Sequence, residues 1–224
     1  MSPNTQLRAA LVETFRTMGD EGLNKGTSGN ASVRLPLGSD GPGFLITPSG
    51  RPVASLAPAD LVVIREGGRF EGDLEPSSEW RLHHDLYAAF PEAGAVLHAH
   101  SPFATSLACQ RLEIPPFHYL IALFGGSTVR CARYATFGTQ ELSDAAVAAL
   151  EGRRACLLAN HGMVVHGRDL AHALTLAIQF ETLCEHYWRT CQLAAPVLLS
   201  DAEMAAAIDQ FARYARLVAR TDRR

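Results

Sequence analysis

The spacing of apolar residues divides the chain into helices and short strands. Leu7, Leu11, Phe15 and Met18 recur every three to four residues, which predicts an amphipathic helix over 5–19. By the same criterion, further helices are predicted over 78–90, 102–110, 138–151, 169–193 and 201–219. Short apolar runs bounded by turn residues predict strands at 31–35, 43–47, 61–65, 94–100, 129–131 and 155–160.

Strands and helices are interleaved, but turn signals such as Gly67-Gly68 indicate hairpins as well. This mixture predicts an α/β (α+β-like) fold in which a mixed, largely antiparallel central sheet is covered by helices. We find no internal repeat and no linker, so we expect a single domain over residues 1–224 that ends in a helix at about 201–219. Ser101 is expected to cap the helix that begins at Pro102.

Composition indicates a soluble globular protein. Hydrophobic residues make up 47% of the chain and charged residues 19%, and the net charge is −3 with no long basic run. This balance argues against nucleic-acid binding, and no stretch reaches membrane-spanning length. The five cysteines include no CxxC pair, which indicates reduced thiols. We therefore expect a cytoplasmic protein that binds neither nucleic acid nor membrane.

Three histidines follow apolar runs. Residues 94–100 end in His98 and His100, which point to the same face of an extended strand, and residues 156–161 end in His161. Two buried strands that each deliver histidine at the carboxyl end resemble a three-histidine zinc site with an open coordination position. A single histidine of this kind can equally be a hydrogen-bonded core residue. Five of the other six histidines lie in helical or loop contexts and are expected to be structural or solvated: His83, His84, His166, His172 and His186.

Turns rich in glycine and hydroxyl groups form a second group of candidates. They lie at 26–30, 47–50 and 76–78, and each offers small side chains, backbone N–H groups and hydroxyl or amide donors. That chemistry can hold a phosphate, although each turn alone is also compatible with an ordinary loop. Neither GxGxxG nor GxxxxGK[ST] is present, which argues against dinucleotide or nucleoside triphosphate use.

Taken in order, these motifs resemble the class II aldolase/adducin family, and within it the L-fuculose-1-phosphate aldolase type. The segments that carry the resemblance are Gly26-Thr-Ser-Gly-Asn-Ala-Ser-Val-Arg34, Leu45-Ile-Thr-Pro-Ser-Gly50, Pro76-Ser-Ser-Glu79, His98-Ala-His100 and Asn160-His-Gly162. The resemblance covers roughly residues 5–195. Adducin-like members generally lack the metal ligands, whereas this chain keeps three histidines and a glutamate, which favours an enzyme over a scaffold.

The resemblance implies roles for these residues. His98, His100 and His161 would bind Zn²⁺ or another divalent ion such as Mn²⁺ or Co²⁺, which would act as a Lewis acid. Glu79 would be the acid/base, although a carboxylate at a helix N-terminus has the same appearance. The implied reaction cleaves a ketose 1-phosphate to dihydroxyacetone phosphate and an aldehyde. The substrate would be fuculose-1-phosphate-like, or a 5-deoxy or 5-methylthio pentulose 1-phosphate.

The resemblance also implies contacts at the two ends of the substrate. Tyr119 and Tyr214 would assist at the aldehyde end, although each is also compatible with ordinary packing. Phe117, Phe124 and Phe137 are candidates for making that end apolar. The phosphate would be held by Thr27, Asn30, Ser49, Gly50, Ser77 and Ser78. Members of this type are usually four-fold symmetric tetramers with active sites at subunit boundaries, so we expect a homotetramer.

Other chemistries on the same metal site stay open at this point. Relatives of this type dehydrate methylthioribulose 1-phosphate, epimerise pentulose phosphates or decarboxylate sugar-acid phosphates. The ligand set does not discriminate, because dehydration needs the same enediolate stabilisation without cleavage of a carbon–carbon bond. A non-enzymatic adducin-like interaction protein is the remaining alternative.

Overall fold

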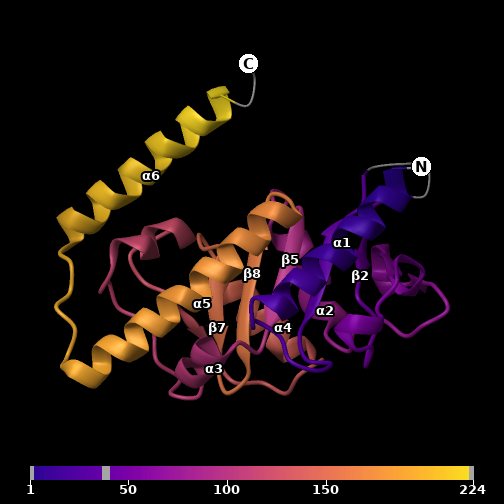
Figure 1. Cartoon of the computed structure of the whole chain (residues 1–224), viewed down its shortest axis with the longest axis horizontal. Coiled ribbons are helices and arrows are strands. Elements are labelled where there is room, and N and C mark those ends of the chain that lie inside the picture. The colour runs from indigo at the N-terminus through magenta and orange to yellow at the C-terminus, as the bar shows by residue number, and fades with distance from the viewer. Residues whose placement is uncertain (1–2, 37–40, 222–224) are drawn as a thin grey trace.

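An eight-stranded sheet forms the centre of the computed structural model, which describes residues 3–36 and 41–221 (Figure 1). Its strand order is β4-β3-β2-β1-β5-β8-β7-β6, and among these neighbours β6 and β7 alone are parallel. The predicted mixed, largely antiparallel sheet is therefore confirmed. The strands are β1 (Asn30–Arg34), β2 (Gly43–Ile46), β3 (Val62–Arg65), β4 (Phe70–Glu71), β5 (Ala95–Ala99), β6 (Cys131–Ala132), β7 (Ala155–Leu158) and β8 (Gly162–Gly167).

Helices cover both faces of this sheet. The α-helices are α1 (Pro3–Asp20), α2 (Trp80–Ala89), α3 (Pro102–Ala108), α4 (Gln140–Leu150), α5 (Leu170–Leu193) and α6 (Asp201–Thr221). Short 3-10 helices occur at η1 (Val53–Ser55), η2 (Pro58–Asp60), η3 (Glu66–Gly68) and η4 (Tyr119–Phe124). Residues of α1, α3 and α5 share one hydrophobic core with the sheet, and residues of α2 and α4 share another.

Alternation along the strands decides which face each side chain takes. In β5, Leu97 packs into the core shared with α1 and α5, whereas Val96 packs into the core shared with α2 and α4. His98 therefore takes the same face as Val96, towards α2.

The chain reverses at His161 in a hairpin that the sequence did not predict. We expected one strand over 155–160, but β7 ends at Leu158 and the chain turns through Ala159, Asn160 and His161 into β8. Asn160 has a φ of 53°, a left-handed conformation that asparagine tolerates better than most residues. The prediction that His161 ends a strand was therefore wrong, because it lies in the turn between two antiparallel strands.

The close approach of this hairpin to β5 depends on Gly162. A Cβ on this residue would lie 2.4 Å from the carbonyl oxygen of Ala99, well inside van der Waals contact. The backbone of β8 can therefore pair with β5 at this level only with glycine at position 162. The pairing brings His161 beside His98 and His100.

Helix α6 packs on η4 along its first part, and its C-terminal end extends beyond the rest of the chain (Figure 1). Ser200 and Glu203 form a capping box at its start, since Ser200 N donates to Glu203 Oε2 at 2.7 Å and Glu203 N donates to Ser200 Oγ at 3.3 Å. On the side towards the body, Met204 is buried and the ring of Phe211 stacks on Tyr119 of η4 with centroids 6.1 Å apart.

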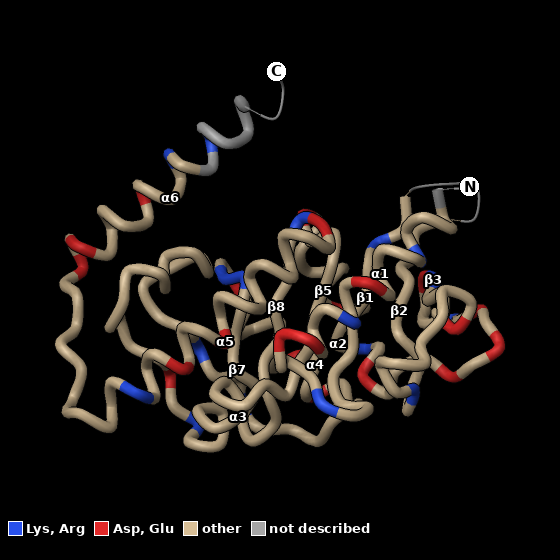
Figure 2. Tube along the Cα trace, in the orientation of Figure 1, with Lys and Arg blue, Asp and Glu red and all other residues tan. Residues whose placement is uncertain are grey.

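Acidic and basic residues are interspersed over the described part of the chain (Figure 2). Among the described residues, no helix is both long enough and apolar enough to span a lipid bilayer.

Candidate functional site

Four side chains converge where β5 ends and β8 begins. The ligand atoms of Glu79, His98, His100 and His161 all lie within 4.8 Å of one another. The Nε2 atom of His98 is 2.9 Å from Nε2 of His100 and 3.1 Å from Glu79 Oε2, and His161 Nε2 is 3.4 Å from Glu79 Oε1. The structure thus brings together the three predicted metal ligands and the predicted acid/base.

Each of the four is held by a different part of the fold. Glu79 immediately precedes α2, His98 lies in β5, His100 follows that strand and His161 lies in the β7–β8 turn. The Nδ1 atom of His98 is 2.8 Å from the carbonyl oxygen of Met163, to which it donates. In the neutral ring, this donation from Nδ1 leaves Nε2 free to bind a cation, and Nε2 is directed at the cluster, as is usual for a metal-binding histidine.

The electrostatics of the cluster are dominated by one carboxylate among three rings. Burial tends to raise the pKa of Glu79, but His98, His161 and the hydrogen bond from Asn30 outweigh it and hold this pKa well below its usual range. Burial likewise tends to lower the pKa of His98, but the neighbouring Glu79 raises it. Burial and then His98 lower the pKa of both His100 and His161 to about 4, so these two rings are neutral at pH 7.

The donor set fits a divalent transition metal ion. Three imidazole nitrogens beside a carboxylate suit Zn²⁺ and related ions, which take three protein ligands and keep a position for substrate in catalytic sites. Among the described residues, the buried Oε1 atom of Glu79 receives no hydrogen bond. An oxygen of this kind, aimed at a group of histidine nitrogens, matches a site that accommodates a cation.

Helix α5 anchors the segment that follows His100. Ser101 occupies the N-cap position of α3, where we expected it to cap the helix, but its side chain caps nothing. Its hydroxyl instead donates to Glu181 of α5 at 2.7 Å, and Glu181 also accepts from the backbone N–H groups of Phe103 (2.7 Å) and Ala104 (2.9 Å). The cap of α3 is therefore supplied by Glu181 from a distant helix.

A cavity of about 360 Å³ adjoins the metal-binding cluster. Glu79, His100 and His161 line it, and so does every residue predicted to bind phosphate: Thr27, Asn30, Ser49, Gly50, Ser77 and Ser78.

The turns that carry these residues are tied to each other. Ser77 N donates to Thr47 O at 3.1 Å, and Ser49 N donates to Glu75 O at 3.0 Å. The two turns therefore form one wall of the cavity.

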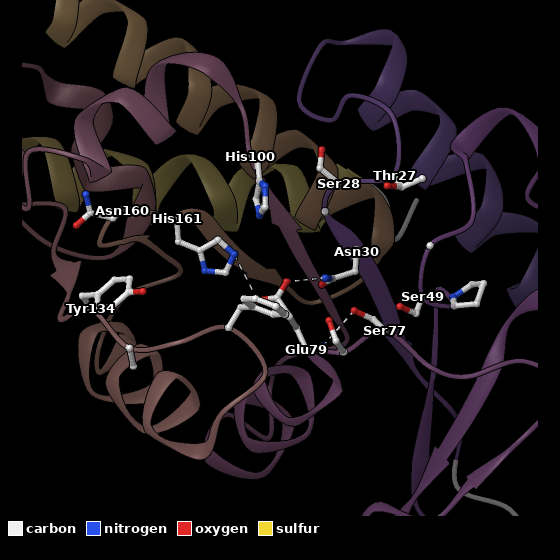
Figure 3. A pocket seen from close by; sticks show the side chains of 16 residues that line it. Thr27, Ser28, Asn30, Ser49, Ser77, Glu79, His100, Tyr134, Asn160 and His161 are labelled. Carbon is white, nitrogen blue, oxygen red and sulfur yellow. Dashed lines mark hydrogen bonds and ion pairs between the residues drawn. The ribbon is translucent and has the colours of Figure 1, made fainter.

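Figure 3 shows that the cavity has two chemically different ends. Thr27, Ser28, Ser49 and Ser77 lie at one end, Tyr134 and Asn160 lie at the other, and Glu79 lies between them. The first end offers hydroxyl and amide groups beside the N-terminus of α2, a setting that suits an anion.

Three residues of the second end were missed by the sequence interpretation of the site. Tyr134, Ala135 and Asn160 line the cavity, and the first two follow β6 in a loop without a motif. Asn160 belongs to the Asn-His-Gly segment. Its position next to His161, a predicted metal ligand, was the one sequence signal that it lies at the site. Phe137, a predicted contact at the aldehyde end, also lines the cavity and is 64% exposed.

Both predicted tyrosines lie elsewhere. Tyr119 and Tyr214 are not among the described residues that line the cavity, and they are 53% and 63% exposed. Tyr214 borders a separate space between α6 and the end of β8. Phe124 is fully buried against Phe180, so the prediction that it lines the aldehyde end was wrong. Phe117 packs against Tyr187 of α5 and does not line the cavity.

Comparisons with known proteins agree with this geometry. A family model described as the class II aldolase and adducin N-terminal domain matches residues 9–188. The chain is 50% identical over 208 residues to the 5-methylthioribulose-1-phosphate/5-deoxyribulose-1-phosphate aldolase of Rhodospirillum rubrum, covering 93% of this chain and 92% of that protein. It is 40% identical over 210 residues to L-fuculose phosphate aldolase of Escherichia coli, covering 93% and 95% of the two chains.

The fold agrees as well. A solved structure of an L-fuculose 1-phosphate aldolase superimposes with a TM-score of 0.86 at 37% sequence identity, covering 94% of this chain and 97% of that one. Family model, relatives and structure together extend over nearly the whole chain. The protein belongs to the class II aldolase and adducin family.

Proposed function

We propose that the protein is a metal-dependent aldolase that cleaves a ketose 1-phosphate to dihydroxyacetone phosphate and an aldehyde. One observation carries the proposal: Glu79, His100 and His161 lie between a hydroxyl-rich end and an aromatic end of a single cavity, and His98 completes their cluster. A substrate with phosphate at one terminus and a less polar group at the other would place its central carbons beside Glu79.

The histidine cluster selects among the known ways to cleave such a bond. His98, His100 and His161 would hold Zn²⁺ or a similar divalent ion, which would act as a Lewis acid on the carbonyl and hydroxyl oxygens of the substrate. The alternative strategy uses a lysine Schiff base. Lys25 is the only lysine of the chain, and it is exposed and does not line the cavity. The Schiff-base route therefore lacks its residue.

The hydroxyl-rich end would bind the phosphate. Thr27, Ser49 and Ser77 lie at this end, and Gly50 leaves room for an approach to the backbone. Ser77 and Ser78 also precede the first turn of α2, where the helix dipole favours a negative charge. This end would fix the position of C1, and with it the positions of C3 and C4.

Glu79 would move the proton that the reaction requires. When the C3–C4 bond breaks, the C4 hydroxyl gives up its proton as C4 becomes the aldehyde carbon, and the electron pair of the broken bond stays on C3. Glu79, which is ionised in the resting site, would take up a proton during this step and deliver it to C3. In the condensation direction, Glu79 removes the same proton. Its position between the two ends of the cavity suits this role.

The aromatic end favours a deoxy or methylthio terminus over a polyol. Tyr134 and Phe137 line it and are more than half exposed, so their rings offer apolar surface to a bound group. We therefore propose a 5-deoxy or 5-methylthio pentulose 1-phosphate as the substrate, and fuculose 1-phosphate as the next candidate.

We also propose that the active unit is a cytoplasmic homotetramer. Tyr119, Tyr214 and the exposed Leu193 and Val197 lie away from the chain's own cavity, where a neighbouring subunit would bury them. All five cysteines are free, which suits a reducing compartment.

The decisive experiment measures dihydroxyacetone phosphate release from 5-methylthioribulose, 5-deoxyribulose and fuculose 1-phosphates, with and without a chelator. We expect chelator-sensitive release that is fastest with one of the pentulose phosphates. If the carbon chain stays intact while water or CO₂ is lost, or while a centre is inverted, the aldolase proposal is wrong and a dehydratase, decarboxylase or epimerase takes its place.

A further inference from the structure

Five buried polar side chains form a hydrogen-bonded chain that begins at Glu79 and ends at Tyr87 in the protein interior. Glu79, His83 and Tyr87 are spaced four residues apart and therefore share one face of α2 and its N-cap. Asn30 and Ser32 are two residues apart and share the face of β1 that looks towards α2. All five side chains are buried.

The two sets alternate in an unbroken hydrogen-bonded chain. Asn30 Nδ2 donates to Glu79 Oε2 at 2.9 Å, and Asn30 Oδ1 lies 2.5 Å from His83 Nε2. On the other side of the ring, His83 Nδ1 lies 2.6 Å from Ser32 Oγ, which lies 2.8 Å from Tyr87 Oη. Every link between Glu79 and Tyr87 is thus within hydrogen-bond distance.

The chemistry of the groups gives this chain a direction. A carboxylate only accepts, so Asn30 must present its amide nitrogen to Glu79 and its oxygen to His83. That oxygen also only accepts, so Nε2 of His83 must carry the proton and donate it. Burial lowers the pKa of His83 to about 3, so the ring is neutral and its Nδ1 accepts from Ser32. Ser32 in turn can accept from Tyr87.

We propose that His83 is a positioning residue: by donating from Nε2 to Asn30 Oδ1, it holds the Asn30 amide so that one Nδ2 hydrogen is given to Glu79 and the other faces the substrate cavity. The proposal rests on the aldolase function proposed above and extends it to a residue outside the cavity.

Without His83, the Asn30 amide loses the donor that keeps its oxygen, and not its nitrogen, on the side away from Glu79. A rotated amide would turn its oxygen towards the carboxylate of Glu79, and that contact is repulsive. It would also remove the N–H group that Asn30, which lines the cavity, can offer to a bound phosphate. His83 therefore fixes the orientation of both the acid/base and one phosphate contact.

Two variants separate the donated proton from the bulk of the ring. Glutamine at position 83 can place an amide nitrogen near the position of Nε2, whereas asparagine reaches only as far as Nδ1. We expect His83→Asn to lower kcat roughly 10–100-fold, the usual range for residues that orient a site through another group. We expect His83→Gln to recover most of that loss, and both variants to keep wild-type metal content.

The matched control is His84→Asn. His84 is the next residue on α2, and it contacts Asp85 outside the chain of five. Its replacement should leave kcat within about twofold, since it neither orients nor touches the site. Thermal unfolding of all three variants reports whether they are folded.

A second measurement is independent of activity. Long-range ¹H–¹⁵N NMR spectra of the Zn²⁺-loaded wild-type protein report which nitrogen of each histidine carries the proton, and the His83 signals are those that disappear in His83→Gln. We expect the Nε2–H tautomer for His83.

A His83 ring protonated at Nδ1 overturns the proposal, because Asn30 would then point its oxygen at Glu79. Wild-type kcat in a folded His83→Asn protein overturns it too, as does an equal loss in the asparagine and glutamine variants. Failure of the wild type to cleave any ketose 1-phosphate would refute the proposed function, while the tautomer would still decide the orientation of Asn30.

Discussion

The carboxylate of Glu181 lies 2.7 Å from the hydroxyl of Ser101, the residue that follows His100. This contact joins the middle of α5 to the end of β5. Because Glu181 also holds the first turn of α3, it fixes the backbone on the carboxyl side of a metal-binding histidine. The position of His100 thus depends on a residue 81 places further along the chain.

Replacing Glu181 with alanine should therefore weaken both the fold and the metal site. The change leaves the buried Ser101 hydroxyl and the N–H groups of Phe103 and Ala104 without their acceptor, at a cost of about 1–3 kcal/mol in the free energy of unfolding. Urea unfolding and metal titration measure the two effects.

Glu185→Ala is the control, since Glu185 lies one turn further along α5 and pairs with Arg189 on the surface. Its loss should cost less than about 0.5 kcal/mol and leave metal affinity unchanged. Equal losses in the two variants would mean that Glu181 acts only as another surface charge.

Gly162→Ala should separate β8 from β5 at the metal-binding cluster. The added methyl group would meet the backbone oxygen of Ala99 at 2.4 Å, and a backbone atom cannot move aside cheaply. We expect a loss of about 1–3 kcal/mol in stability, typical of overpacking, together with weaker metal binding. Gly19→Ala in α1 is the control, because its Cβ meets only Val53 at 3.5 Å and alanine favours a helix. If Gly162→Ala unfolds like the wild type, the steric argument fails.

The hairpin at Gly162 also marks where sequence reasoning stopped short. The apolar run before His161 predicted a strand correctly, but the run after Gly162 was not recognised as its antiparallel partner. Local periodicity reports burial and does not report which strands pair. The His98 and His100 pair could be predicted because i and i+2 spacing is local, whereas the approach of His161 depends on the β5–β8 register.

Buried polar partners were harder to predict than the cavity itself. All the residues predicted to bind phosphate line one cavity. They could be predicted because turns rich in glycine and hydroxyl groups are recognisable in the sequence. His83 was expected to be structural or solvated, yet its spacing of four from Glu79 placed it on the same helix face. Phe124 is an apolar aromatic residue, a type that suits a pocket lining, but it lies in the core against Phe180. No local sequence pattern reveals that long-range contact.

Glu79→Gln and His98→Ala should separate proton transfer from metal binding. Glutamine retains the shape of Glu79 but moves no proton, so we expect kcat to fall roughly 10²–10⁴-fold with metal content unchanged. His98→Ala removes a ligand, and both metal and activity should be lost. Elemental analysis and steady-state kinetics measure these results, and Glu75→Gln, an exposed acid four residues away, serves as the control. Full metal content in His98→Ala would refute its role as a ligand.

His166 should make the protein less stable as the pH falls. Burial lowers its pKa below the ordinary 6.5, while its Nε2 faces the carbonyl oxygen of Arg153 and its ring stacks on Phe90. At pH values between the lowered pKa and 6.5, His166 is protonated in the unfolded chain and neutral in the folded chain. The free energy of unfolding therefore rises with pH across that range.

The variant His166→Phe keeps a ring against Phe90 but cannot titrate. We expect the free energy of unfolding of the wild type minus that of the variant to be smaller at pH 5 than at pH 8. Urea unfolding at both pH values measures this difference. Losses linked to the metal occur in both proteins and cancel in the difference. A difference that does not change with pH would mean that His166 has an ordinary pKa.

Mixing two impaired variants should restore activity if neighbouring subunits complete the site. Glu79 lies in the cavity of its own chain, whereas Tyr214 of α6 lies outside it. We expect Glu79→Gln and Tyr214→Phe each to be slow alone. After unfolding and refolding together at equal amounts, about a quarter of the sites in a cyclic assembly should pair a native Glu79 with a neighbour's native Tyr214. Activity near a quarter of wild type would support shared sites, and the average of the two separate activities would mean that each chain works alone.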